Sequence, residues 1–461
     1  MPGTDKNMAT QYRHLYLPLE IKARELESKV LLASEASSRG FSAIIGHNSL
    51  LQRGLSSGAL PPGLYFDKSL SRHKYHRLQR LWARGNKIAS LDEESGLLSF
   101  DYTSFLRERS CHTTTELASA VFCWGTHDAE NWRDAYHQFR NKIFISGSPR
   151  VDFWRYDFSG YYKEETARLR ERFPNLVLIA SNLSGSQSYL TLKDLLRQGR
   201  ANGSITDAKD EERLIVDYND NDRMRECFIS LVKRISEEFP SFNFVVRPHP
   251  VEKVDAWSGL HEKRNVFVIF SGSITPWIQS ANVIIHNGCT SAIEARAINK
   301  PVIAFEPFSS RLNREVPNAL SFVARTENDV SNALTEMTRR SRAEAENYKP
   351  EITDNILGAR FCNLTGRPAV ERIIDQIERL ELPRAGMPKF NGATWLYAKK
   401  FQGARVLDRY FKNDCLITRK YPGLNRLEIE SIIEKLASIK RMYENVSVTT
   451  LYPGIFKIQS H

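Results

Sequence analysis

The fold is decided by residues 14–46, which read HLYLPLEIKARELESKVLLASEASSRGFSAIIG. The apolar runs at the two ends of this stretch, 14–19 and 41–45, predict two β-strands. Between them, apolar residues recur at roughly helical spacing from Ile21 to Ala33, which predicts an α-helix. A strand, a helix and a second strand in this order form a β-α-β unit, so we expect the two strands to be parallel.

The same alternation continues along the chain in two series. Strand candidates of the first series lie at 63–66, 87–91, 118–124 and 142–145. Those of the second series lie at 176–180, 242–246, 266–270, 283–285 and 302–305. The sequence therefore predicts an α/β protein with two doubly wound Rossmann-type domains, residues 1–160 and 161–383, that face each other across a cleft.

The last part of the chain, residues 384–461, is predicted to be a basic, aromatic-rich helical extension. It has 14 Lys and Arg residues against 6 Asp and Glu residues, and so holds most of the net charge of +11. Its aromatic residues include Trp395, Tyr397, Phe401, Tyr410, Phe411 and Tyr421. Basic residues mixed with aromatic ones suit an anionic membrane surface. A solvated helical face that packs on the two domains explains the same composition, and nucleic acid fits it less well.

The composition argues against three other features. No stretch of about 18 uncharged apolar residues occurs, so a membrane-spanning helix is not expected. The first 14 residues contain no apolar core of a signal peptide. The six cysteines form no CxxC pair, which indicates a reducing compartment, and His73 and His76 have no further ligands beside them, so no metal site is expected.

Two prolines fix a loop at the end of the predicted strand 242–246. This loop contains Arg247, Pro248, His249 and Pro250. Ligands of parallel α/β sheets bind at the carboxyl ends of the strands, and a guanidinium group with an imidazole ring suits a phosphate. We therefore interpret this loop as part of a phosphate site. A strand-ending turn with a capping histidine is the alternative.

A second loop follows the predicted strand 283–285 and opens a helix. Its Gly288 allows a ligand to approach the backbone, and Thr290 and Ser291 place hydroxyl groups at the helix start. Glu294 lies one turn into the helix, where a carboxylate can accept hydrogen bonds from ribose. An ordinary helix cap with a first-turn acid has the same pattern.

Three consecutive acids, Asp92, Glu93 and Glu94, follow the predicted strand 87–91. Clustered carboxylates shift one another's pKa values, which general acid–base or nucleophilic catalysis requires. We therefore interpret the cluster as a candidate catalytic group, and a solvated acidic turn is the alternative.

Seven segments of the chain resemble, in the same order, those of the surface carbohydrate biosynthesis protein family. They are LPLEIKAREL (17–26), GHNS (46–49), PPGLYFDKSLS (61–71), LDEESG (91–96), GSPRVD (147–152), RPHP (247–250) and HNGCTSAIEA (286–295). The resemblance covers roughly residues 13–310. More distantly, the set is similar to GT-B transferases that use CMP-activated ulosonic acids, including bacterial sialyltransferases and the β-Kdo transferases of capsule and O-antigen assembly. It implies a GT-B fold and a glycosyltransferase that moves a ulosonic acid, Kdo or a nonulosonic relative, from a CMP-sugar to a growing bacterial surface glycan.

The resemblance also implies roles for residues of the C-terminal nucleotide-sugar domain. Thr290 and Ser291 would hold the CMP phosphate, His249 would donate a further hydrogen bond, and Glu294 would bind the ribose. The whole nucleotide-binding set is Arg247, His249, Pro250, Asn287, Gly288, Thr290, Ser291 and Glu294.

In the N-terminal acceptor domain, the resemblance implies that the acids at 92–94 face the anomeric carbon. One of them would act as a base in an inverting reaction or as a nucleophile in a retaining one. Related sialyltransferases have a D/E-D/E-G motif, and here Ser95 stands between the acids and Gly96, which leaves open which carboxylate is catalytic. Glu20 and Arg24 are expected on the acceptor side, and an i,i+4 ion pair between them is the alternative.

A DxD-like motif, Asp220 to Asp222, resembles the metal motif of the other glycosyltransferase fold class. We expect it instead to cap a helix that begins at Arg223, after a polar loop at 199–222. The implied leaving group is a phosphate monoester, which needs hydrogen-bond donors more than a metal, so no metal or cofactor is expected.

The expected partners are a CMP-sugar, a lipid-linked glycan acceptor and an anionic membrane surface, and no nucleic acid. The protein is therefore expected to be cytoplasmic and peripheral at the inner face of the bacterial plasma membrane. Three other functions stay open: a polyol-phosphate transferase that uses CDP-glycerol, a sugar-nucleotide epimerase, and a non-catalytic GT-B scaffold.

Overall fold

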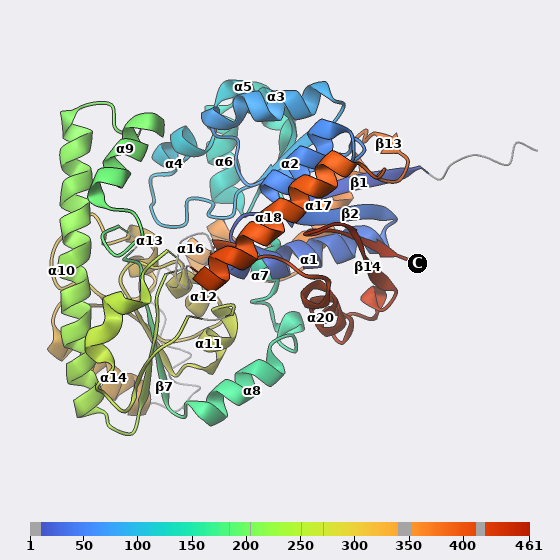
Figure 1. Cartoon of the computed structure of the whole chain (residues 1–461). Coiled ribbons are helices and arrows are strands. Elements are labelled where there is room, and N and C mark those ends of the chain that lie inside the picture. The colour runs from blue at the N-terminus through green and yellow to red at the C-terminus, as the bar shows by residue number, and fades with distance from the viewer. Residues whose placement is uncertain are drawn as a thin grey trace, which may run out of the picture.

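Two mainly parallel β-sheets with packed helices form the protein (Figure 1). The computed structural model describes residues 11–183, 185–202, 204–249, 251–270, 272–339, 353–411 and 420–461. None of the helices in these ranges is long and apolar enough to cross a membrane.

The first sheet begins with the β-α-β unit that the sequence predicts. β1 (Tyr12–Leu19) and β2 (Phe41–His47) pair in parallel and are joined by α1 (Lys22–Ser38). The sheet continues in parallel through β3 (Leu64–Asp67), β4 (Lys87–Leu91), β5 (Ala118–Cys123) and β6 (Ile143–Ile145). Its other helices are α2 (Asn48–Ser57), α3 (Tyr75–Ala83), α4 (Tyr102–Arg109), α5 (His112–Leu117), α6 (Thr126–Ala135) and α7 (Pro149–Asp152).

Both faces of this sheet are covered, as in a doubly wound domain. Leu15 and Leu17 of β1 belong to an apolar cluster that includes the buried face of α1. Tyr16, which points to the other face, belongs to a cluster with the buried residues of α2 and α3. Successive side chains of a strand point to opposite faces, so covering both makes the strands apolar throughout.

The second sheet is wholly parallel, with the strand order β12-β11-β10-β7-β8-β9. Its strands are β7 (Leu176–Ala180), β8 (Asn243–Arg247), β9 (Val266–Val268), β10 (Val283–His286), β11 (Val302–Phe305) and β12 (Phe322–Ala324). The helices that follow the first domain are α8 (Lys163–Arg172), α9 (Leu192–Asn202), α10 (Ala208–Glu238), α11 (Thr275–Ser280), α12 (Ser291–Ala297), α13 (Glu315–Ala319), α14 (Glu327–Arg339), α16 (Thr353–Arg360) and α17 (Ala369–Glu378). The predicted fold class, two Rossmann-type domains in a GT-B-like arrangement, is confirmed.

The prediction for the DxD-like motif is wrong. Helix α10 begins after Asp207, whose side chain accepts a hydrogen bond from the backbone N–H of Asp210, so Asp220 and Asp222 lie inside the helix and cap nothing. Of residues 208–222 only Asn221 is buried, so a polar sequence is compatible with the helix. Charge pairs one turn apart, such as Arg213 with Asp210 at 3.3 Å, favour helix in a polar sequence.

The C-terminal extension folds back onto the first domain. It contains β13 (Arg384–Ala385), α18 (Gly392–Phe411) and α20 (Arg426–Ala437), and it ends in a hairpin of β14 (Val446–Tyr452) and β15 (Ile455–Ser460). β15 pairs antiparallel with β2, so residues from the two ends of the chain share one sheet. The prediction of a helical extension was incomplete, because the hairpin is short and alternates polar with apolar residues.

The segment that returns from the second domain, 363–370, is attached to the first domain by a buried carboxylate. Asp152, at the end of α7, accepts hydrogen bonds from Asn363 Nδ2 at 2.7 Å and from the backbone N–H groups of Ala369 and Val370 at 2.8 and 3.1 Å. Burial raises the pKa of this carboxyl group to about 7. These bonds attach the start of α17 to α7.

We predict that the hairpin is part of the core of the first domain. Ile458 is fully buried in the cluster around α1, so Ile458→Ala should lower the free energy of unfolding by about 2–5 kcal/mol, measured by urea denaturation. Thr449→Ala, at an exposed position of β14, should change it by no more than about 0.5 kcal/mol. Equal, small effects of both substitutions would show that the hairpin is not part of the cooperative unit.

Candidate functional site

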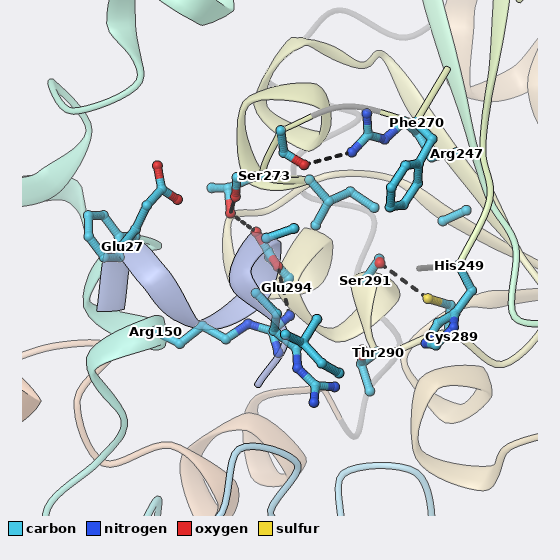
Figure 2. Close-up of a pocket in the computed structure, with 18 of the residues that line it drawn as sticks. Glu27, Arg150, Arg247, His249, Phe270, Ser273, Cys289, Thr290, Ser291 and Glu294 are labelled. Carbon is cyan, nitrogen blue, oxygen red and sulfur yellow. Dashed lines mark hydrogen bonds and ion pairs between the residues drawn. The ribbon is translucent and has the colours of Figure 1, made fainter. Parts of the chain in front are cut away.

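A cavity lies between the two domains, at the carboxyl ends of strands from both sheets (Figure 2). Its empty volume is about 980 Å³, open solvent at the mouth included. The first domain contributes polar side chains from α1, α7 and the segment before α8: Arg24, Glu27, Ser28, Arg150 and Tyr162. The second domain contributes Ser181, Arg247, His249, Ser273, Thr275, Cys289, Thr290, Ser291 and Glu294.

Arg247 and His249 lie where β8 ends, as the sequence predicts. Arg247 is buried, donates to Gly272 O at 3.0 Å and lies 5.1 Å from the centre of the Trp277 ring. The His249 Nδ1 accepts from the backbone N–H of Val251 at 3.4 Å, which leaves the proton of the neutral ring on Nε2. Burial lowers the pKa of His249 to about 4, so the ring is a neutral hydrogen-bond donor at pH 7. Pro250 lies outside the described residues.

The loop after β10 is held in shape by His286, whose part in the loop the sequence analysis missed. Its Nδ1 accepts from the backbone N–H groups of Gly288 at 2.9 Å and Cys289 at 3.3 Å, and its Nε2 lies 2.9 Å from Ser321 Oγ. Asn287 holds the segment that follows β7, because its Oδ1 accepts from the backbone N–H of Asn182 at 2.7 Å. These contacts set the path of the loop.

Gly288 is required by the loop itself. Its φ is +77°, and a Cβ there would lie 2.8 Å from Leu312 O. The close neighbour of this glycine is therefore the protein's own backbone.

Thr290, Ser291 and Glu294 all line the cavity at the start of α12. Ser291 Oγ lies 3.2 Å from Cys289 Sγ. Glu294 is fully buried, and its Oε1 accepts from Thr275 Oγ1 at 2.5 Å. Its Oε2 lies 3.8 Å from Nη2 of Arg150, which reaches it from the first domain. Burial raises the pKa of Glu294.

The structure places the three acids at 92–94 in different surroundings. Asp92 forms a two-bond ion pair with Arg109, at 2.7 and 3.1 Å. Glu93 is buried against Lys29 at 2.8 Å; burial opposes its charge, but the lysine dominates and lowers the pKa of Glu93. Glu94 is exposed and lies 3.4 Å from Arg24. None of these three acids is among the described residues that line the cavity.

Glu20 and Arg24 each have another partner. Glu20 pairs with Lys68 and accepts from Asn48 Nδ2 at 3.0 Å, whereas Arg24 pairs with Glu94 and lines the cavity. The alternative expectation, an ion pair between Glu20 and Arg24, is therefore wrong.

Two cavity residues were missed by sequence reasoning. Glu27 of α1 accepts hydrogen bonds from the hydroxyl groups of Tyr161 and Tyr162, at 3.2 and 2.5 Å. Arg150 is in the quoted segment GSPRVD but was given no role. Both look like ordinary surface charges in sequence, and their partners are more than a hundred residues away.

Within the ranges that the structure describes, no group of three or more His, Cys, Asp or Glu side chains could hold a metal ion.

No family model matches the sequence, and neither does any curated protein. Among solved structures, UDP-GlcNAc 2-epimerase from Neisseria meningitidis bound to UDP-GlcNAc is similar at 12% identity and a TM-score of 0.48, over 80% of this chain and 100% of that one. The Methanocaldococcus jannaschii UDP-GlcNAc 2-epimerase in complex with UDP-GlcNAc and UDP is similar at 13% identity and a TM-score of 0.49, over 79% and 99%. The wall teichoic acid polymerase TagF with CDPG is similar at 10% identity and a TM-score of 0.48, over 80% and 88%. Likenesses this distant assign no substrate or reaction to this chain.

We predict that acid destabilises the protein partly through His286. Burial lowers its pKa to about 3, below the ordinary 6.5, so the folded state favours the neutral ring. The stability it contributes is present above pH 6.5 and is lost as pH falls toward 3, by roughly 2–3 kcal/mol at pH 4.5. The measurement is the free energy of unfolding in urea between pH 7 and 4.5.

His286→Asn is the matched variant for this measurement. An Asn Oδ1 can accept the same loop N–H groups but does not titrate, so the variant should lose less stability between pH 7 and 4.5 than the native chain. His47 and His249, whose pKa values burial lowers to about 4, contribute to both proteins alike. Identical pH dependence of the two proteins would contradict the assignment to His286.

Proposed function

We propose that this chain is a glycosyltransferase that moves a ulosonic acid, Kdo or a nonulosonic relative, from a CMP-sugar to a growing bacterial surface glycan. The observation that carries the proposal is the interdomain cavity, which has phosphate-type donors on one wall and two arginines, Arg24 and Arg150, on the other. The first wall suits a nucleotide and the second suits an acidic sugar.

The second domain would bind the CMP. Arg247 and the Nε2–H of His249 are donors for its phosphate, together with the hydroxyl groups of Thr290 and Ser291. The phosphate gains negative charge as the bond to the sugar breaks, and fixed donors in a closed site stabilise that charge. The Glu294 carboxyl group, which is buried beside them, would accept hydrogen bonds from the ribose.

The first domain would bind the sugar's own carboxylate, a group that ulosonic acids have and most hexoses lack. A guanidinium group binds a carboxylate through two parallel hydrogen bonds. Within the described ranges, the side chain of Arg150 has one ion pair, the long 3.8 Å contact with Glu294, so its donors can turn to a ligand in the cavity. This favours an acidic sugar over glycerol or a neutral hexose.

The donor assignment predicts selective stabilisation by cytidine nucleotides. In thermal denaturation, CMP should raise Tm while UDP and GDP do not, because a ligand that binds the folded state adds about 2.7 kcal/mol at a hundred times Kd. His249→Ala should reduce that rise. Selective stabilisation by UDP or GDP would contradict the CMP assignment, and transfer of phosphorus from CDP-glycerol to the product would favour the polyol-phosphate alternative.

The same assay tests the arginines. Arg150→Ala should weaken binding of CMP-Kdo by about 10-fold or more, the loss of a charged hydrogen bond, and leave binding of CMP unchanged. Arg168→Ala, at an exposed position of α8, is the control. Equal weakening of CMP and CMP-Kdo would place Arg150 at the nucleotide instead.

We also propose that the protein binds an anionic membrane through α18. This helix packs on α2 with Ala398 buried, and it crosses the first domain in Figure 1. Its outer face exposes 37% of Trp395, 50% of Leu396 and 57% of Leu407, next to the exposed Lys399 and Lys400. Exposed apolar side chains flanked by lysines suit the boundary between lipid headgroups and acyl chains. A lipid-linked acceptor would be presented on the same surface.

Point substitutions test this surface, since deletion of the extension would remove β14 and β15 from the first sheet. Leu396→Ser should weaken binding to vesicles that contain phosphatidylglycerol by about 10-fold or more, from the apolar burial lost. Leu427→Ser, on α20 and 75% exposed, should have no effect. Binding that survives Leu396→Ser and Trp395→Ser together would overturn the role of α18.

A further inference from the structure

Glu27 is a carboxylate that lines the cavity and is oriented by neutral groups. It lies on α1, three residues after Arg24, and keeps part of its surface open to the cavity. Tyr161 Oη donates to its Oε1 at 3.2 Å and Tyr162 Oη to its Oε2 at 2.5 Å. Burial raises the pKa of Glu27, and Glu165 adds to this, while the two tyrosines and Lys435 act in the opposite direction.

A line of hydroxyl groups joins Glu27 to the proposed ribose site. Tyr162 Oη lies 3.4 Å from Ser273 Oγ, which lies 3.4 Å from Thr275 Oγ1. Thr275 in turn donates to Glu294 at 2.5 Å. The two cavity carboxylates therefore lie at opposite ends of one polar wall, and Figure 2 shows Glu27 on the first-domain side and Glu294 on the second. The donor sugar would occupy the same cavity that Glu27 lines.

The acids at 92–94 are less suited to take a proton in this cavity. Asp92 is held in an ion pair with Arg109 and does not line the cavity. Glu93 is paired with Lys29, which lowers the pKa of this carboxyl group and so weakens it as a base. Glu94 is at the exposed rim, paired with Arg24. Among the described residues, hydroxyl groups orient Glu27, and no ion pair holds it as in Asp92 and Glu93. Burial outweighs the opposing effects of the tyrosines and Lys435, so the pKa of Glu27 is raised.

We propose that Glu27 is the general base of the transfer reaction and that Tyr161 and Tyr162 are its positioning residues. The proposal rests on the CMP-sugar function above. The acceptor O–H gives its proton to the Glu27 carboxylate while its oxygen forms a bond to the anomeric carbon. The bond from that carbon to the phosphate oxygen breaks, and its electron pair leaves with CMP. One proton and one electron pair are thus transferred, no oxidant or metal takes part in the balance, and the anomeric configuration inverts.

The experiment measures release of CMP from CMP-Kdo by the full-length chain, with water as the acceptor. Glu27→Gln should slow release at saturating CMP-Kdo by about 10²–10⁴-fold, the usual contribution of a general base. The rise in Tm with CMP should stay unchanged, because Glu27 lies on the other domain. Formate should restore part of the activity of Glu27→Ala by replacing the lost carboxylate.

Glu35→Gln is the matched control. Glu35 is on the same helix, is buried, and accepts from Tyr443 Oη at 2.9 Å, but it does not line the cavity. Its variant should release CMP at the native rate per folded molecule, with folding checked by Tm.

Two results would overturn the proposal. If Glu27→Gln stays within about threefold of the native rate while Glu93→Gln or Glu94→Gln is inactive, the base is in the acidic cluster, although the transferase function stands. If the native chain neither binds CMP nor releases it from CMP-Kdo, the proposed function fails and the assignment of Glu27 fails with it.

Discussion

The buried carboxylate of Asp152 determines how the two domains are joined. It accepts three hydrogen bonds from the segment that returns from the second domain, and so fixes where α17 begins. Gly147 shows how closely the two segments approach, because a Cβ at this position would lie 2.3 Å from Asn363 Oδ1. The attachment fixes the start of α17, from which the chain continues to α18 and the final hairpin. An acid here is effective because one carboxylate satisfies several buried donors at once, which an apolar residue would leave unpaired.

The same short helix serves the cavity. α7 has only four residues; Asp152 at its end receives the returning chain, and Arg150, two residues earlier, extends into the interdomain space toward Glu294. The same four-residue helix therefore positions both Asp152 and Arg150. The position of Arg150 in the cavity is thus linked, through α7, to the contact between Asp152 and the start of α17. No residue of that contact lines the cavity.

Much of the fold could be predicted from local patterns. β1, α1 and β2 lie within a few residues of their predicted positions, and β7 and β11 match theirs, because strands buried on both faces are nearly uninterrupted apolar runs. The hairpin of β14 and β15 could not be predicted in this way. Its polar alternation is stabilised by pairing with β2, about 400 residues earlier in the chain, and no local pattern contains that information.

The candidate site could likewise be predicted only where the signal is local in sequence. The loops that contain His249 and Thr290 were found because a strand end followed by proline or glycine is visible in sequence, and both do line the cavity. Which carboxylate faces the ligand was not visible. Three consecutive acids are conspicuous, but their neighbours Arg109 and Lys29 turn two of them into structural ion pairs. Glu27 is inconspicuous, and it differs from an ordinary helical acid only because two tyrosines, 134 and 135 residues later, donate to it.

Neutral groups hold several polar elements in and beside this cavity. His286 and His249 are kept uncharged by burial, and Glu27 is oriented by hydroxyl groups. A buried charged group needs a partner of opposite charge. That partner would take up the hydrogen-bonding positions that a ligand needs. Neutral imidazole and hydroxyl groups hold the loops and the carboxylate in place without such a partner. The guanidinium groups that reach the cavity from the first domain are Arg24 and Arg150. In the described part of the chain their contacts to carboxylates are long, 3.4 and 3.8 Å, so a bound anion can compete for them. The cavity therefore combines neutral imidazole and hydroxyl groups with two first-domain guanidinium groups that a ligand can recruit, and we infer that this combination suits a substrate that has both a phosphate and a carboxylate.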